Sequence, residues 1–211
     1  MKLTKFEHAC LLLEVTAKRL IIDPGSFTMP LGDFGDVEAV VITHEHGDHA
    51  TAEQLERIVG RNPEVKIFGP AGVVSALRDF EITKTMDGHK VSVGPFDLEF
   101  VGSRHAIIHP TIPQVDNVGV IVNDLLFYPG DAFTKPPREV DTLAVPCSAP
   151  WLKIAEVMDY VLEIKPKKVF PVHEMLLSVA GKTVTNQRIK GVTEAIGGEF
   201  FVLEPGESID L

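Results

Sequence analysis

Three of the eight histidines of this chain lie within the stretch HEHGDH, directly after the apolar run Ala39–Thr43. Imidazole and carboxylate groups together suit zinc, iron or manganese. His44 and His46 are two residues apart and can leave a strand end on the same side, so both can bind one ion. Asp48 and His49 come next and can face a second ion nearby. The spacing therefore predicts a metal site.

The elements around this stretch are those that would position such a site. The run before it reads as a strand buried on both faces. Gly47 is expected to let the backbone turn sharply between the two pairs of side chains. After the turn, residues 51–54 have the spacing of a capping box, and Leu55, Ile58 and Val59 form a helical apolar stripe. The stretch is thus predicted to lie where a strand ends and a helix begins.

The remaining chain alternates twice between β-rich segments and helices. Strands are predicted at residues 8–16, 18–23, 65–69, 90–93, 96–101, 118–122, 125–128, 143–146, 169–172 and 199–203. Helices are predicted at residues 71–79, 150–162 and 186–196, and Asn123-Asp124 is expected to form a two-residue hairpin turn. Two sheets packed face to face with helices outside would bury these elements. We therefore predict an α/β fold, a four-layer αββα sandwich, forming a single domain over residues 1–211.

Composition and charge limit the classes of partner. Hydrophobic residues make up 45% of the 211 residues, enough for a sizeable core. The formal net charge of −10 disfavours a nucleic-acid partner, because phosphate binding needs a basic face. No apolar run approaches the roughly 20 residues that span a bilayer, and Ala9–Leu13 is not followed by a secretory cleavage site. We expect a cytoplasmic protein without a membrane partner, in which Cys10 and Cys147 are buried free thiols.

Five motifs together resemble those of the metallo-β-lactamase superfamily, whose fold is the αββα sandwich. In chain order they are IIDPGSF at 21–27, HEHGDH at 44–49, VGSRHAIIHP at 101–110, YPGDAF at 128–133 and FPVHEM at 170–175. They cover nearly the whole chain. The pattern is most similar to small, stand-alone metal-dependent hydrolases related to the ascorbate-phosphate lactonase group.

The resemblance implies two divalent metal ions, with zinc favoured over manganese, iron and nickel. For the first ion it implies the ligands His44, His46 and a middle histidine. For the second ion it implies Asp48, His49 and His173, with Asp131 bridging both ions.

The middle histidine is His105 or His109, since both lie in the matching motif. His105 follows the predicted strand 96–101 directly and is favoured as the strand-end ligand. His109 precedes a proline in a loop, where it could contact substrate or simply lie at the surface. Asp23 either caps a turn or orients the metal-binding turn from behind, as the resemblance implies. Trp151 is expected to pack within a helix or to line a pocket wall.

The implied ligands predict a hydrolase. A water shared by two divalent ions has its pKa lowered to roughly 7, which makes hydroxide available at neutral pH. Asp48 would bind the second ion and hold this hydroxide for attack on a small ester, lactone or phosphoester. The alternatives are a phosphodiesterase or nuclease-type hydrolase and a non-catalytic metal-binding protein. The sequence leaves the small-molecule substrate and the oligomeric state open.

Overall fold

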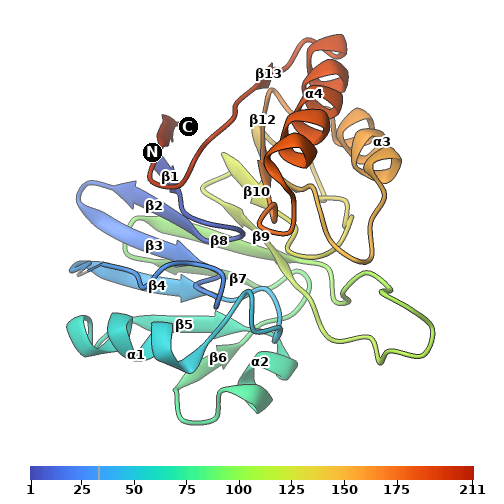
Figure 1. Cartoon of the computed structure of the whole chain (residues 1–211). Coiled ribbons are helices and arrows are strands. Elements are labelled where there is room, and N and C mark those ends of the chain that lie inside the picture. Colours follow the sequence, from blue (N-terminus) through green and yellow to red (C-terminus); the bar gives the residue numbers. More distant parts are fainter. Residues whose placement is uncertain (33) are drawn as a thin grey trace.

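Two seven-stranded β-sheets face each other in the computed structural model, which describes residues 1–32 and 34–211 (Figure 1). In spatial order the first sheet contains β14 (Ser208–Asp210), β1 (Lys2–Lys5), β2 (Leu11–Val15), β3 (Lys18–Ile22), β4 (Val37–Val41), β5 (Lys66–Gly69) and β6 (Ile82–Lys84). The second contains β13 (Glu199–Phe200), β12 (Lys168–Val172), β11 (Thr142–Pro146), β10 (Leu126–Tyr128), β9 (Gly119–Val122), β8 (Phe96–Val101) and β7 (Lys90–Val93).

Both sheets are mixed in the same way. In the first, β14, β1, β2 and β3 pair antiparallel, and β3 to β6 pair parallel. In the second, β7 to β10 pair antiparallel, and β10 to β13 pair parallel. The carboxyl ends of neighbouring parallel strands lie at one edge of a sheet, which is where open α/β sheets place their ligand sites.

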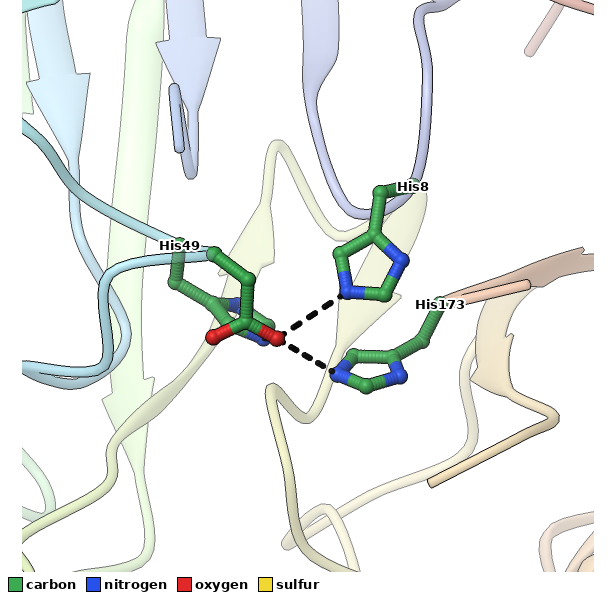
Figure 2. A group of neighbouring side chains, drawn as sticks. His8, His49 and His173 are labelled. Atoms are coloured by element: carbon green, nitrogen blue, oxygen red, sulfur yellow. Dashed lines mark hydrogen bonds and ion pairs between the residues drawn. The ribbon is translucent and has the colours of Figure 1, made fainter. Parts of the chain in front are cut away.

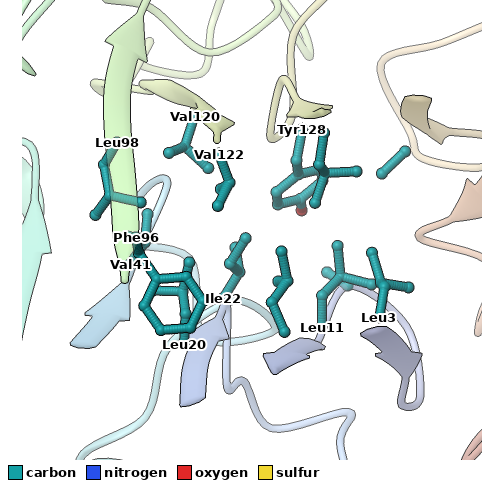
Figure 3. Packing of buried hydrophobic residues seen from close by; sticks show 14 of the residues in the cluster. Leu3, Leu11, Leu20, Ile22, Val41, Phe96, Leu98, Val120, Val122 and Tyr128 are labelled. Carbon is teal, nitrogen blue, oxygen red and sulfur yellow. The ribbon is translucent and has the colours of Figure 1, made fainter. Parts of the chain in front are cut away.

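The inner faces of the sheets form the central core. Leu11, Leu20 and Ile22 of the first sheet pack toward Val120 and Val122 of the second, and all five are fully buried (Figure 3). The burial of these side chains supplies much of the driving force for folding.

Helices cover both outer faces. The helices α1 (Ala52–Arg61) and α2 (Ala71–Ala76) lie on the first sheet, through Leu55, Ile58 and Val73. On the second sheet lie α3 (Ile154–Ile164) and α4 (Val179–Ala195), through residues such as Val157 and Ile189. The predicted αββα sandwich is therefore confirmed (Figure 1). Among the described residues, no helix has both the length and the apolar character that crossing a membrane requires.

Several local predictions are confirmed. The side chain of Thr51 accepts a hydrogen bond from the backbone N–H of Gln54 and caps α1, as the capping-box spacing predicts. Asn123 and Asp124, which join β9 to β10 together with Leu125, have positive φ angles of 51° and 55°, as the two central residues of a type I′ turn require. Cys10 and Cys147 are buried, and within the described chain neither forms a disulfide.

The predicted helix at 150–162 begins too early. The structure starts α3 at Ile154, where the Glu156 carboxylate accepts a hydrogen bond from the backbone N–H of Lys153. Trp151 therefore lies in the loop before the helix and not in the helix itself.

Other element boundaries also differ from prediction. The helix predicted at 186–196 begins earlier, at Val179, because Ser178 caps it. The short strands β1, β6 and β14 were not predicted. The outer pair, β6 and β14, forms sheet edges that depend on a single neighbouring strand.

Candidate metal centre

Loops that follow the carboxyl ends of β3, β4, β8, β10 and β12 carry the predicted site residues. They bring together the side chains of His44, His46, Asp48, His49, His105, Asp131 and His173, arranged in overlapping groups that could hold metal ions. Both sheets contribute. The five motifs, far apart in sequence, thus meet at one place, and the cluster includes His105.

The first group contains His44, His46 and His105. His44 Nε2 and His46 Nδ1 are 3.1 Å apart, and the His105 ring centroid is 4.9 Å from that of His44 and 4.8 Å from that of His46. Nitrogen ligands about 2.0–2.1 Å from a tetrahedral zinc ion are about 3.3 Å apart. The spacing of these nitrogens therefore suits a shared ion.

The second group contains Asp48, His49 and His173, together with His8. Asp48 Oδ2 lies 3.4 Å from His173 Nε2 and 3.8 Å from His49 Nε2. Figure 2 shows His8, His49 and His173 turned toward one common point. This group has one carboxylate and two imidazoles from the predicted set.

Asp131 lies between the two groups. Its Oδ1 is 3.3 Å from His49 Nε2, and its Oδ2 is 3.4 Å from His105 Nε2 and 3.1 Å from His173 Nε2. One carboxylate therefore faces histidines of both groups, which is the position that a bridging ligand needs.

The outward nitrogens of four histidines are held by oxygen atoms. His44 Nδ1 is 3.0 Å from Thr43 Oγ1, and His49 Nδ1 is 2.7 Å from Asp23 Oδ2. The other two Nδ1 atoms, of His105 and His173, each lie 2.6 Å from a backbone carbonyl oxygen, of Ala106 and Ser148. With a proton on each Nδ1, every Nε2 faces the centre with its lone pair, as metal-binding histidines do.

The inward-facing atoms are short of hydrogen-bond partners. Among the described residues, buried atoms without a hydrogen bond include His49 Nε2, His105 Nε2, Asp131 Oδ1 and His173 Nε2. Buried polar atoms are seldom left unsatisfied, and these four converge on one place. A divalent cation would satisfy them all, so the residues present fit a metal.

Burial and neighbouring charges set the protonation of the centre. Burial lowers the pKa of His44 well below its usual range. Burial also opposes a charge on His49, but Asp131 and Asp23 outweigh it and hold the His49 pKa well above its usual range. His173 behaves similarly, since Asp131 and Asp48 raise its pKa to about 9 despite burial. Metal binding would displace these protons, and the carboxylates that favour them would equally favour a cation.

Asp23 lies behind the second group. Its Oδ1 accepts a hydrogen bond from the backbone N–H of Thr43, and its Oδ2 accepts bonds from Thr43 Oγ1, His49 and the hydroxyl of Tyr128 at 2.7–2.9 Å. Asp23 is fully buried. The carboxylate thus joins the ends of β3, β4 and β10 and fixes the ring of His49. Tyr128 was not recognised from the sequence, although it begins the YPGDAF motif.

Glycine is needed at positions other than Gly47. A Cβ atom on Gly25 would lie 1.9 Å from the backbone oxygen of Asp48, so this residue lets the 21–27 motif approach the metal-binding turn closely. Gly130 has a φ of 65° and directly precedes Asp131. Gly47 does not have a positive φ, and a Cβ atom added there would have nothing within 4 Å. The predicted need for glycine at this position is therefore wrong.

Two further residues hold Asp131. Asn117, fully buried, accepts a hydrogen bond from the Asp131 backbone N–H at 3.0 Å and donates one to the Pro129 carbonyl at 2.9 Å. The indole Nε1–H of Trp151 donates to Asp131 Oδ2 at 2.9 Å. Asn117 was missed, since a lone asparagine gives no recognisable signal in the sequence.

His8 and His109 differ sharply in their placement. His8 is fully buried, and its ring centroid lies 3.9 Å from that of His173. His109 is exposed, and its Nδ1 lies 2.7 Å from Thr111 Oγ1. The structure thus brings His105 rather than His109 into the cluster, and it adds His8, for which the motifs imply no ligand role.

Replacing Asp23 with asparagine should weaken metal binding. An amide cannot accept all four hydrogen bonds, so the His49 ring would lose its fixed orientation. Loss of such a supporting contact typically costs about 10–100-fold in metal affinity. Competition with a chromogenic chelator would measure the change. Asp159→Asn, at an exposed position on α3, is the matched control, and equal affinities in the two variants would contradict this role for Asp23.

Comparison with known proteins identifies the family. The family model of the beta-lactamase superfamily domain matches residues 2–173. The chain is 33% identical over 213 residues to Protein Rv0786c of Mycobacterium tuberculosis, covering 99% of this chain and 98% of that protein. It is 24% identical to the UPF0173 metal-dependent hydrolase PH1671 of Pyrococcus horikoshii, covering 97% of this chain and 96% of that protein.

A solved structure shares the fold. Igni18, described as a novel metallo hydrolase from the archaeon Ignicoccus hospitalis, superposes with a TM-score of 0.74 at 21% sequence identity, covering 99% of this chain and 97% of that one. Its similarity supports the two-sheet architecture. From the family match over residues 2–173 and the relative that is 33% identical over nearly its whole length, this chain belongs to the beta-lactamase superfamily.

Proposed function

We propose that the chain holds two divalent metal ions, with zinc favoured, and hydrolyses a small ester, lactone or phosphoester. The observation that carries this proposal is the carboxylate of Asp131, which faces histidines of two separate groups at 3.1–3.4 Å. When bound, such ions lower the pKa of a coordinated water to about 7 and stabilise developing negative charge on the substrate. Because both sheets supply ligands, we also propose that residues 1–211 act as one domain.

The residues take distinct roles in this proposal. His44, His46 and His105 hold the first ion, and His49 and His173 hold the second with Asp48. Asp131 contacts both ions.

Asp48 has an additional role, as the catalytic base. Its side chain is 25% exposed, whereas that of Asp131 is 4% exposed. Asp48 is therefore the carboxylate that reaches the open side of the centre. There it can orient the attacking water and accept its proton.

The alternatives have less support. Nuclease activity would require a basic surface for the nucleic acid, whereas the formal net charge is −10. A protein that only stores metal would have no need of a pocket beside its ligands. A cavity of about 280 Å³, lined by His46, Asp48 and His105 among others, opens onto the centre.

Removing metal should destabilise the fold. The proposed ligands come from separate loops of both sheets, so an ion binds the folded chain far better than the unfolded one. At a hundred- to thousandfold excess over its dissociation constant, a ligand of this kind adds about 3–4 kcal/mol to the free energy of unfolding. Chelation should therefore lower the melting temperature and added zinc should restore it. An unchanged melting curve after metal loss, verified by elemental analysis, would contradict the prediction.

The proposed function is tested by a hydrolase screen. The zinc, manganese, iron and nickel forms would be assayed with carboxylic esters, lactones, thioesters, phosphomonoesters and phosphodiesters. We expect metal-dependent turnover of at least one class, lost on chelation. If no class is turned over with both sites filled, the non-catalytic alternative is favoured.

A further inference from the structure

The cavity beside the metal centre has two chemically different sides. One side is formed by the proposed ligands. Apart from Ser26, the rest of the lining is apolar and consists of Phe27, Ile108, Pro150, Trp151 and Leu176. Phe27 is 39% and Leu176 56% exposed, so large apolar side chains remain in contact with water at the mouth of the cavity. A bound molecule would cover them.

The same cavity lacks basic side chains. Among the described residues that line it, none is a lysine or an arginine. Two basic side chains near the site are already paired. Lys5 Nζ lies 2.5 Å from Glu174 Oε1 in a buried ion pair, and Arg104 Nη1 lies 3.3 Å from Asp116 Oδ1. Proteins that recognise phosphate commonly use free arginine or lysine side chains.

We propose that the substrate is a neutral carboxylic ester or lactone whose acyl part is apolar. This inference rests on the proposed function and narrows it. The ester carbonyl would lie against the metal centre, and the acyl chain would extend along Phe27, Trp151 and Leu176. The volume of about 280 Å³ is at or below the lower end of ligand pockets, so the acyl group is short to medium in length. Phosphorylated lactones and phosphoesters would find no lysine or arginine for the phosphate in the described lining.

A series of p-nitrophenyl esters tests the acyl preference, because the leaving group stays constant. From acetate through butyrate to hexanoate, kcat/KM should rise by up to about fourfold for each methylene that becomes buried. With p-nitrophenyl phosphate and bis(p-nitrophenyl) phosphate, kcat/KM should be far lower than with the hexanoate ester. A flat chain-length series, or faster turnover of the phosphate compounds, would overturn the proposal.

Matched variants locate the preference in the cavity wall. Leu176→Ala should lower kcat/KM for the hexanoate ester about 10-fold and leave the acetate ester within about twofold. The control is Val179→Ala, which removes an 84% exposed apolar side chain outside this cavity. It should keep the whole chain-length series unchanged. An equal loss of kcat/KM for the hexanoate ester in both variants would contradict the role of Leu176 and the apolar lining in the acyl preference.

Binding can be measured even where turnover fails. Trp151 is the one tryptophan in the sequence, so its fluorescence reports on this cavity alone. Titration of the zinc-loaded protein with butyrate, hexanoate and inorganic phosphate should give the tightest binding for hexanoate. Hexanoate binding without ester turnover would contradict the proposed function and leave the apolar site standing. Ester turnover without a chain-length effect on binding would contradict the apolar site and leave the proposed function standing.

A separate observation concerns His8. Its Nδ1 lies 3.4 Å from the backbone nitrogen of Met175 and can only accept that hydrogen bond, so the ring proton is on Nε2. Nε2 lies 3.2 Å from Asp48 Oδ2 and donates to it. The His8 carbonyl oxygen accepts a hydrogen bond from the backbone N–H of His173 at 2.9 Å. Figure 2 shows the His8 ring beside that of His173, joined by a dashed line to the carboxylate.

We infer that His8 is a positioning residue that fixes the carboxylate of Asp48 for the second ion. The residue has a left-handed φ of 61°, a conformation that is uncommon for residues other than glycine. Its backbone and its ring thus contact the segments on both sides of the second group. His8 Nε2 donates to Asp48 Oδ2, the oxygen that also faces His49 and His173, and this bond fixes the direction of the carboxylate.

Two substitutions separate the hydrogen bond from the packing. His8→Phe keeps a ring against His173 but cannot donate, and His8→Gln keeps an N–H donor at about the position of Nε2. Affinity for the second zinc ion, measured by calorimetry, should fall about 10–100-fold in His8→Phe and recover in His8→Gln, with the first ion unaffected. Normal affinity in His8→Phe would overturn the inference. Failure of His8→Gln to recover would show that His8 acts as a ligand or through packing instead.

Discussion

Replacing His105 with alanine should abolish hydrolysis and reduce the metal content to about one ion per chain. His105 Nε2 is buried and lies 3.4 Å from Asp131 Oδ2. Without it the first ion would keep only two histidines of its own, His44 and His46, and a carboxylate of Asp131 that it shares with the second ion, whereas catalytic zinc sites generally use three protein ligands besides water. Elemental analysis of the purified variant measures the metal content, and the best substrate of the wild-type protein measures turnover.

His109→Ala is the matched control for this experiment. His109 lies four residues further along the same loop, is exposed, and has its hydrogen bond with Thr111. The variant should keep its metal content and most of its activity. If metal were lost on replacing His109 and kept on replacing His105, the assignment of the middle histidine would be wrong.

Asp48→Asn should lower kcat by about 10²–10⁴ even when both metal sites are refilled. The amide oxygen can still coordinate an ion, but the side chain can no longer accept a proton from water. Loss of a positioned general base typically costs this much. Assays at rising zinc concentration would separate weakened binding from lost catalysis.

Glu45→Gln is the control within the same motif. Like Asp48→Asn, this substitution replaces a carboxylate with an amide. The Glu45 side chain, however, lies against Gly72 of α2 and outside the metal-binding groups. Its kcat should stay close to that of the wild type. Near-normal turnover in refilled Asp48→Asn would remove Asp48 from the catalytic step.

The sequence predicted the parts of the site that sit in short motifs at strand ends. The apolar run before His44 and the capping box after His49 defined the strand, turn and helix locally, so their geometry followed from neighbouring residues. His105 could be favoured over His109 for the same reason, because it comes closest to the end of a strand.

Contacts between distant segments could not be predicted in this way. Tyr128 reaches Asp23 across 105 residues of sequence, and His8 meets Met175 across 167. The sequence spacing of these residues does not indicate that they meet, because the partner of each side chain depends on how the two sheets pack. The start of α3 was misplaced for a related reason. Trp151 fits an apolar helical stripe, yet its indole donates to Asp131 in the folded chain.

The account depends most on two metal ions bound by one shared carboxylate. Anomalous diffraction from crystals of the zinc-loaded protein, collected on both sides of the zinc absorption edge, tests this directly. We expect two anomalous peaks, one among His44, His46 and His105 and one among Asp48, His49 and His173, with Asp131 contacting both. A single peak, or peaks away from these side chains in fully loaded protein, would contradict the account.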